Sequence, residues 1–307
     1  MKKPSLGTVI LKKGKERPIL NRHHWVFSGA VQSADAGNGS IVTVRSSSGE
    51  ILGQGYYNGS SNIPVRMLTF GDEAFTNDTL RFLLSSAVER RAANPLVRDT
   101  SAVRLVFSEG DFLPGLIIDS YANHLVMQCL TLGIDTMKDT IAQMGAEITN
   151  AKSIYERSDY PGRRIEGLQA AQGQLFGTTP DEIVAEEHGV KYPINVKEGQ
   201  KTGFFIDQRE NRALIRDCAA GRKVLNVFCY TGGFTFAALK GGASSAVSVD
   251  ISRDALEQAE KICAHNGFTA PSELIEADAF EYLRNEPVDA DLVIIDPPAF
   301  AKSSGDV

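Results

Sequence analysis

Cysteine is scarce in this sequence, and long apolar runs are missing. The four cysteines are Cys129, Cys218, Cys229 and Cys263, and no two of them form a CxxC pair. This spacing argues against a zinc site or a disulfide framework. No apolar run approaches the roughly 20 residues needed to cross a bilayer, and the start, MKKPSLGTVILKKGK, lacks the apolar core and cleavage site of a secretory signal. We therefore expect a cytoplasmic protein without a metal ion or a membrane partner.

A strong net charge is also missing, because the formal charge is only −6. The charge is unevenly distributed: residues 1–34 carry seven cations against Glu16 alone, a local charge of +6, and the remaining residues therefore sum to −12. Such a basic face can meet phosphates, although a solvated lysine-rich terminus explains it equally well. The cations of this face include Lys12, Lys13, Lys15, Arg17 and Arg22.

The length of 307 residues, with 42% hydrophobic and 23% charged residues, indicates a globular protein of two or three domains. We expect residues 1–72 to form a small all-β domain, because β-rich runs alternate with turn sequences such as Asn58-Gly59. The predicted strands cover residues 41–44, 51–57 and 63–70. A helix should follow, with Asn77 or Asp78 as its cap and Pro95 at its end.

Residues 73–189 are predicted to form an α+β middle domain. Strands are expected at 103–107, 113–118 and 124–130, joined as a meander, and the pattern of residues 135–148 indicates a helix. A further strand at 153–156 leads into SDYPGRRIEG, which we interpret as a polar loop.

Residues 190–307 alternate between strand and helix patterns. Asp207 is predicted to start the first helix, with Glu210 as its capping-box partner. Strands are then expected at 223–228, 246–250, 273–275 and 291–295, separated by helices at 234–239, 252–266 and 279–285. Strands spaced by helices indicate right-handed βαβ units and a parallel sheet. The fold class is therefore α/β, with a doubly wound C-terminal domain.

A ligand of such a sheet binds at the carboxyl ends of the strands. The first of these segments is LNVFCYTGG, where Gly232 and Gly233 allow a ligand to approach the backbone closely. The GxGxxG spacing typical of dinucleotide folds is missing, which counts against NAD. A tight turn without a ligand is the alternative interpretation.

Acidic residues end the next two predicted strands. Asp250 can accept hydrogen bonds from both hydroxyls of a ribose, and Ser252 can cap the following helix. Asp278 can accept from an adenine amino group, with Ala279 or Phe280 against the ring. An acid at a strand end is weak evidence alone, since helix caps are commonly Asp. Two of them after a glycine turn indicate an adenosine without a pyrophosphate.

The fourth strand runs into Asp296-Pro297-Pro298, followed by Phe300. Residues before proline are held extended, and proline has no N–H, so nearby carbonyls stay free to accept from a substrate amine. An acid beside a free carbonyl suits the amino edge of a nucleobase.

In this order the segments resemble the motifs of class I S-adenosylmethionine-dependent methyltransferases. A narrower resemblance is to one family, the large-subunit ribosomal RNA cytosine-C5 methyltransferases with an N-terminal PUA domain. It is carried by VKEGQKTGFFIDQRENR, NVFCYTGGF, ERSD with RRIEG, and DPPAFAK. HHWVFSGAV resembles the start of the PUA domain in that family. The resemblance implies a Rossmann-like sheet, a PUA-like barrel that holds RNA with Trp25 and the basic residues, and ribosomal RNA as the partner; we also consider a homodimer. It implies that the GQKTGFF loop (residues 199–205) and Asp207-Gln208 close over the methionine end of the cofactor. It also implies that Asp296 faces the site and that the cofactor turn is formed by Asn226, Phe228, Tyr230, Thr231 and Gly232.

Methylation of cytosine C5 needs activation, which a cysteine thiolate provides by adding to C6. Each of the four cysteines reads more simply as structural, and in the family the nucleophile comes from the strand after DPP. The sequence stops after four of the usual strands, so we expect a fragment of a longer chain, or loss of the rest, and an exposed edge at strand four. The alternatives are methylation of a purine amino group, a non-catalytic RNA-binding or assembly protein, and an NAD-dependent oxidoreductase.

Overall fold

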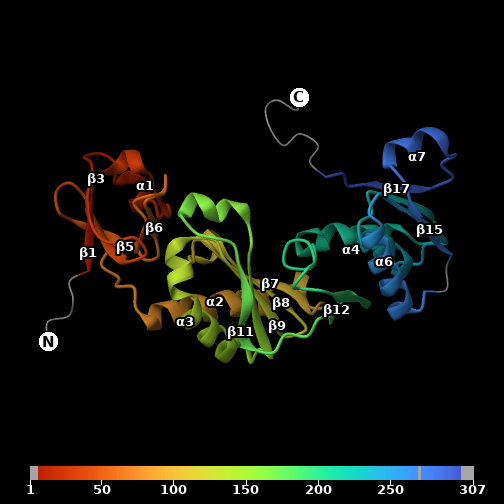
Figure 1. Ribbon diagram of the computed structural model, residues 1–307, viewed down its shortest axis with the longest axis horizontal. Helices are drawn as coiled ribbons and strands as arrows, with labels where there is room; N and C mark the ends of the chain where they lie inside the picture. The colour runs from red at the N-terminus through yellow and green to blue at the C-terminus, as the bar shows by residue number, and fades with distance from the viewer. Residues whose placement is uncertain (1–5, 269–270, 299–307) are drawn as a thin grey trace. The chain divides into compact units, whose positions relative to one another are not determined.

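The computed structural model describes residues 6–268 and 271–298 (Figure 1). The chain divides into two compact units, and each is described by itself. One consists of residues 1–98, 103–181 and 196–202, and the other of residues 99–102, 182–195 and 203–307. Across the described residues, no helix combines the length and the apolar character needed to cross a membrane.

The first unit begins with a six-stranded sheet of order β2-β6-β5-β4-β1-β3. Every second side chain along its strands points into the core. Val9 and Leu11 of one strand belong to the same hydrophobic cluster as Val42 and Val44 of the neighbouring strand. The predicted all-β character is confirmed, whereas the first three strands, β1 to β3, were not predicted. The elements are β1 (Gly7–Leu11), α1 (Arg17–Leu20), β2 (Trp25–Val26), η1 (Ser28–Ala30), β3 (Val31–Asp35), β4 (Ile41–Arg45), β5 (Ile51–Tyr57) and β6 (Val65–Met67).

A second sheet of order β11-β10-β9-β8-β7 completes this unit. β8 pairs antiparallel with β9, as a meander requires, and β10 pairs parallel with β9. The edge strand β11 was not predicted. The elements are α2 (Asn77–Ala92), η2 (Pro95–Val97), β7 (Ala102–Phe107), η3 (Ser108–Asp111), β8 (Leu116–Tyr121), β9 (His124–Cys129), α3 (Leu132–Thr149), β10 (Ser153–Ser158), η4 (Pro161–Glu166) and β11 (Ala171–Gly177).

Two local predictions in this unit were wrong. The cap of α2 is Thr76 rather than Asn77 or Asp78, because Thr76 and Thr79 form a reciprocal capping box. The segment SDYPGRRIEG is not simply a polar loop, since it forms η4 and buries Glu166. The Glu166 carboxylate accepts from Ser61 Oγ and Arg66 Nη1, both at 2.8 Å, and so joins the two sheets of the unit.

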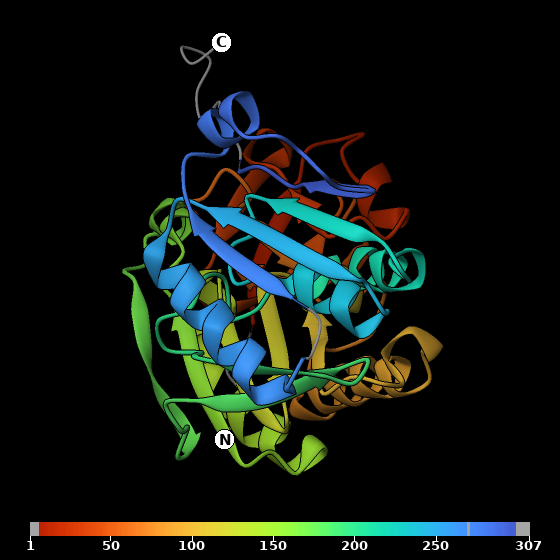
Figure 2. The same cartoon turned by 90° about the vertical axis from the view of Figure 1, so that its right-hand side faces the viewer.

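The second unit contains a hairpin and a four-stranded sheet of order β16-β15-β14-β17 (Figure 2). All three strand pairs of that sheet are parallel, which confirms the α/β fold. The elements are β12 (Ile183–Glu187), β13 (Val190–Ile194), η5 (Ile206–Gln208), α4 (Arg209–Cys218), β14 (Lys223–Val227), α5 (Gly233–Lys240), β15 (Ser245–Asp250), α6 (Arg253–Asn266), β16 (Ser272–Glu276), α7 (Ala279–Asn285) and β17 (Leu292–Ile295).

Two details of this unit concern its ends and edges. The prediction of a capping box formed by Asp207 and Glu210 was wrong. A 3-10 turn precedes α4, and Gln208 is the N-cap residue of α4. β17 lies at the edge of the sheet, as predicted, and its Val293 and Ile295 are 44% and 55% exposed.

Candidate cofactor site at the carboxyl edge of the parallel sheet

The strand register brings the four predicted segments to one edge of the sheet. Val227, the last residue of β14, pairs with Val249 on one side and with Ile295 on the other. Asp250 pairs in turn with Glu276. The residues that follow these positions therefore share the carboxyl edge. The chain order also reverses at β14, which is where open parallel sheets bind ligands.

The turn after β14 has a left-handed backbone conformation, which residues other than glycine rarely adopt. Phe228 and Tyr230 have φ values of 61° and 51°, and Gly232 follows with 75°. A Cβ atom at Gly232 would come within 2.7 Å of the Phe236 ring. Left-handed non-glycine residues cost about 1–3 kcal/mol each and cluster at ligand sites. The sequence indicated the role of Gly232. The family resemblance placed Phe228 and Tyr230 in the same turn, but their left-handed backbone was not predicted.

Asp250 holds this turn to the end of β15. Its Oδ2 accepts from the backbone N–H of Tyr230 at 2.7 Å, and its Oδ1 accepts from the N–H of Ser252 at 2.9 Å. A carboxylate has about four acceptor positions, so both oxygens keep capacity for ribose hydroxyls. The predicted cap is confirmed, since Ser252 Oγ accepts from Ala255 N–H.

Asp278 is the N-cap residue of α7. Its Oδ1 accepts from the N–H groups of Phe280 and Glu281 at 2.9 and 3.0 Å, which is the capping role noted as the simpler interpretation. Ala279 is buried, whereas Phe280 is exposed and meets Phe228 edge-to-face at 5.9 Å. Phe280 and Phe228 thus pair at the carboxyl edge, from the ends of two different strands.

Asn226 is a buried polar residue within β14. Its Nδ2 donates to Thr235 Oγ1 at 3.0 Å, but its Oδ1 is buried without a partner among the described residues. A buried acceptor without a donor costs about 1–3 kcal/mol. Such an atom beside the cofactor turn is suited to a donor from a bound molecule.

The segment after β17 is linked to the start of α4. Gln208 Nε2 donates to Asp296 Oδ2 at 3.3 Å, and Asn211 Nδ2 donates to Gln208 Oε1 at 2.6 Å. The bond from Asn211 fixes which end of the Gln208 amide faces Asp296. Pro297 and Pro298 follow and are exposed, and Phe300 lies outside the described residues.

A buried ion pair that the sequence did not reveal anchors α4. Arg212 donates through Nε and Nη2 to the two oxygens of Glu187 at 2.7 and 2.9 Å, and through Nη1 to the carbonyl of Phe205. Its guanidinium also lies 4.4 Å from the ring centroid of Phe204. The only sequence signal was the cluster of arginines in DQRENR.

Residues 199–202 of the GQKTGFF loop, which we expect to close over the methionine end of the cofactor, belong to the first unit, and residues 203–205 belong to the second. Thr202 donates to Asp119 Oδ2 at 2.6 Å, and Arg157 donates to the carbonyls of Val196 and Gly199. The first part of the loop is therefore fastened to the middle sheet, and closure of the loop over a cofactor stays a prediction.

Comparison with known proteins supports this geometry. A family model described as S-adenosylmethionine-dependent methyltransferase matches residues 167–306, and one described as PUA-like domain matches residues 9–70. The chain is 38% identical to ribosomal RNA large subunit methyltransferase I of Aeromonas salmonicida, with 96% of this chain and 76% of the relative covered. It is 40% identical to the protein of the same name from Shewanella amazonensis, with 95% and 76% covered.

The chain belongs to the ribosomal RNA large subunit methyltransferase I family.

Solved structures agree on the fold of this family. A protein described as "A putative sam-dependent methyltransferase from Streptococcus mutans" has a TM-score of 0.78 at 23% identity, over 95% of this chain and 77% of that chain. A second structure, a methyltransferase described as complexed with SAH, has a TM-score of 0.80 at 23% identity, over 96% and 77%. The PUA-like and Rossmann-like parts of the predicted fold are thereby confirmed.

Family membership makes S-adenosylmethionine the cofactor and rejects the NAD and non-catalytic alternatives. The carboxyl edge of the sheet is suited to this cofactor. The Asp250 carboxylate can accept hydrogen bonds from ribose hydroxyls, and the buried Asn226 Oδ1, which has no partner among the described residues, can accept one from a bound molecule. Bound there, S-adenosylmethionine supplies an electrophilic methyl group, which leaves alignment and exclusion of water to the protein. In the described part of the chain, no group of three or more His, Cys, Asp or Glu residues could hold a metal ion.

Two of the four cysteines of this chain, Cys129 and Cys229, are buried. Burial raises the pKa of Cys229, in the cofactor turn, to about 12, and burial likewise raises the pKa of Cys129 to about 12. A thiol with such a pKa is protonated at neutral pH and is a poor nucleophile. Cys218 is exposed at the end of α4, and Cys263 is partly buried on α6.

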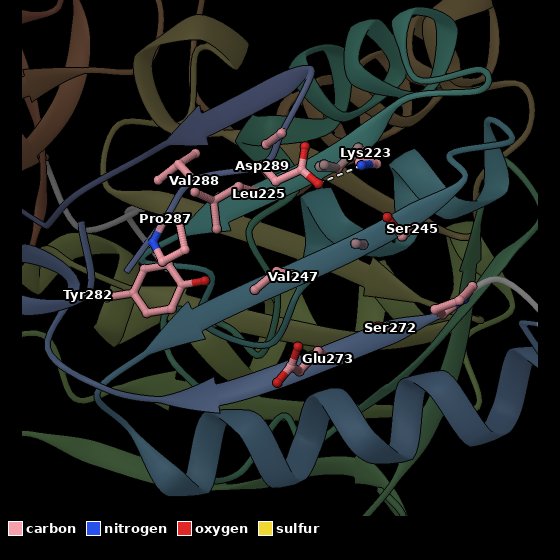
Figure 3. A pocket seen from close by; sticks show the side chains of 14 residues that line it. Lys223, Leu225, Ser245, Val247, Ser272, Glu273, Tyr282, Pro287, Val288 and Asp289 are labelled. Carbon is pink, nitrogen blue, oxygen red and sulfur yellow. Dashed lines mark hydrogen bonds and ion pairs between the residues drawn. The ribbon is translucent and has the colours of Figure 1, made fainter. Parts of the chain in front are cut away.

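A separate hollow of about 520 Å³ lies against the amino-terminal halves of β14, β15 and β16 (Figure 3). Lys223 and Asp289 point toward one another at its rim and form an ion pair at 2.6 Å. Tyr282 lies on the other side of the hollow. Its lining does not include the residues expected to bind the cofactor, so the hollow is distinct from the carboxyl-edge site.

The residues predicted to bind RNA are all exposed in the PUA-like domain. Lys12, Lys13, Lys15 and Arg17 lie between the end of β1 and the start of α1, and Arg22 follows α1. Trp25 is 36% exposed and donates through Nε1 to Glu109 Oε1 at 2.7 Å. The structure thus gathers these cations close together in one short stretch of the fold.

Proposed function

We propose that this protein transfers the methyl group of S-adenosylmethionine to C5 of a cytidine in large-subunit ribosomal RNA. The names of relatives at 38–40% identity, ribosomal RNA large subunit methyltransferase I, support the RNA substrate. The observation that carries the proposal is the shared carboxyl edge, where the cofactor turn, Asp250 and the Asp296-Pro297-Pro298 segment follow adjacent parallel strands. Residues 1–72 would hold the RNA, residues 73–189 would form the α+β middle domain, and residues 190–307 would bind the cofactor.

The proposed roles follow from the contacts of each residue. Asp250 would bind the ribose, while Asp278 would use the oxygen that does not cap α7 toward the adenine. Phe280 and Ala279 would line the ring, and Gly233 would let the cofactor approach the backbone. Asp296, oriented by Gln208, would accept from the amino group of the target base.

Activation of C5 requires a thiolate near the base. Cys129 and Cys229 do not suit this role because burial raises their pKa to about 12. Cys218 and Cys263 lie on helices α4 and α6 rather than in the segments after the strands. In this proposal the nucleophile is therefore a cysteine of the source protein that follows Asp296, outside residues 1–307.

Methylation of a purine amino group is the second candidate. It is favoured by the lack of a suitable nucleophile among the four cysteines, because methyl transfer to an amine needs no thiolate. The exposed Asp296 beside Pro297, which has no N–H, offers acceptors for that amine.

The test is transfer of a labelled methyl group from S-adenosylmethionine to large-subunit ribosomal RNA by the full-length source protein, followed by mass spectrometry of the nucleosides. The small-subunit RNA serves as the control substrate. We expect 5-methylcytidine in the large-subunit RNA alone, and an Asp296→Asn variant with a much lower kcat. A methylated purine would replace the first candidate with the second, and transfer to neither RNA would refute both.

A further inference from the structure

Three aromatic side chains gather on one exposed face of the PUA-like domain. His23 and Trp25 lie edge-to-face with ring centroids 5.9 Å apart, and Trp25 and Phe27 do the same at 6.1 Å. The rings of His23 and Phe27 are 6.4 Å apart and tilted by 35°. Phe27 is 50% exposed. We call His23, Trp25 and Phe27 the aromatic triad.

The extended backbone explains why these rings share a face. Side chains alternate along a strand, so the triad points one way while His24 and Val26 point the other. Val26 is buried in the core of the domain, and His24 Nδ1 lies 2.8 Å from the carbonyl oxygen of Met67. β2 is also an edge strand of its sheet. The domain core therefore leaves the triad uncovered.

A hydrogen bond fixes the orientation of Trp25, the central residue of the aromatic triad. The Trp25 indole donates to Glu109 of η3 at 2.7 Å, which fixes the ring between its two neighbours. Although burial opposes ionisation, hydrogen bonds from Ser108 and Trp25 hold the pKa of Glu109 below its usual value. Glu109 is thus a charged and strong acceptor for the indole.

Cations flank the triad. The Lys12 ammonium donates to the carbonyl of Gly29, two residues beyond Phe27, at 3.0 Å. Arg22 is exposed and directly precedes His23 in the chain, and its guanidinium lies 5.8 Å from the ring centroid of Phe70, which packs against His24 rather than against the triad. Between residues 12 and 22 there are five cations and only one carboxylate, Glu16. A protein partner with an apolar surface has no need of this charge, whereas a polyanion does.

We propose that the aromatic triad is a stacking platform for an unpaired base of RNA, with the flanking cations binding its phosphates. Aromatic faces next to cations are the features that bind single-stranded nucleic acid with little sequence preference. This inference rests on the proposed function, because it takes RNA as the substrate. It assigns Phe27 and His23 a role beside Trp25, and it selects unpaired over double-stranded segments.

The test uses the emission of Trp25, which is the one tryptophan of the chain and therefore reports on the triad alone. The probe is a single-stranded RNA of about twelve nucleotides, compared with the same sequence as a duplex. We expect the single strand to quench Trp25 and to bind more tightly than the duplex. Phe27→Ala should weaken binding about tenfold, which lies within the range expected for the loss of one stacked base. Fluorescence anisotropy of labelled RNA gives the same constants independently.

Matched variants separate stacking from other causes. Phe82→Ala removes an aromatic side chain that is 66% exposed on α2, and it should leave the affinity unchanged. Phe27→Tyr should restore binding and Phe27→Leu should not. The dependence of affinity on salt should stay unchanged in Phe27→Ala but flatten in a Lys12→Gln, Lys13→Gln variant.

Equal affinities of Phe27→Ala and Phe82→Ala for the single strand would overturn the inference. So would a loss of self-association in Phe27→Ala with RNA affinity intact, because the triad would then be a protein contact. Methyl transfer to ribosomal RNA, measured in parallel on the full-length source protein, keeps the two proposals apart. Transfer without an effect of Phe27 refutes the platform alone, and Phe27-dependent binding without transfer refutes the proposed function alone.

Discussion

The carboxylate of Asp250 and the backbone N–H of Tyr230 are joined by a hydrogen bond of 2.7 Å. This bond ties the end of β15 to the turn that follows β14, where Tyr230 has a φ of 51°. The residue expected to bind the ribose is therefore also the residue that stabilises the strained cofactor turn. Its loss should affect both cofactor affinity and folding.

Replacing Asp250→Asn should reduce the affinity for S-adenosylhomocysteine about tenfold. An amide has a single acceptor oxygen, so one of the two N–H groups, of Tyr230 or Ser252, loses its partner. This loss costs about 1–3 kcal/mol. Asp254→Asn, an exposed carboxylate in the first turn of α6, is the matched control and should keep full affinity. Isothermal titration calorimetry measures both, and equal affinities would contradict the assignment.

Gly232→Ala should destabilise the protein by about 2–5 kcal/mol. The left-handed φ accounts for about 1–2 kcal/mol, and the contact of the new Cβ with the Phe236 ring adds about 1–3 kcal/mol. Gly267→Ala has a similar φ but nothing within 4 Å, so only the first cost applies. Urea unfolding of the two variants should show this difference. Identical losses would mean that Phe236 moves aside freely.

Glu187→Gln should cost about 3–5 kcal/mol, because it leaves Arg212 buried without its counter-ion. The same substitution at Glu257, whose ion pair with Arg253 is exposed on α6, should cost less than about 0.5 kcal/mol. Denaturant titration gives both free energies of unfolding. A cost for Glu187→Gln no larger than for Glu257→Gln would show that the buried pair does not anchor α4.

The thiols should differ in reactivity toward Ellman's reagent in the native protein. Cys218 is exposed and should react first. Cys129 and Cys229 should react only after unfolding, because burial raises the pKa of each to about 12 and keeps it protonated at any lower pH. The rate for these two should therefore stay low as the pH rises to about 9, where free thiols are ionised. Reaction of either before unfolding would contradict this prediction.

The sequence predicted the parallel sheet well because its signals are local. Each strand is a short apolar run, each turn carries glycine or an acid, and Ser252 stands directly before its helix. These features also located Asp250, Asp278 and Asp296, since the carboxyl ends of parallel strands share one edge. The family resemblance named the cofactor for which this edge is shaped.

The features that the sequence missed depend on contacts between distant residues. The partner of Arg212 lies 25 positions earlier, and Gln208 and Asp296 are 88 positions apart. β11 is an edge strand of mixed polarity, so it lacks the apolar run of a central strand. The cap of α2 went to Thr76 because its partner Thr79 completes a reciprocal pair, which neighbouring Asn77 and Asp78 cannot.

The most direct test of the account is a crystal structure of the protein with S-adenosylhomocysteine. We predict that the ribose contacts Asp250, that the adenine lies between Asp278 and Phe280, and that the chain from Phe228 to Gly233 keeps its left-handed turn. Density for the ligand in the hollow beside Lys223 and Tyr282, with the carboxyl edge empty, would contradict the central claim.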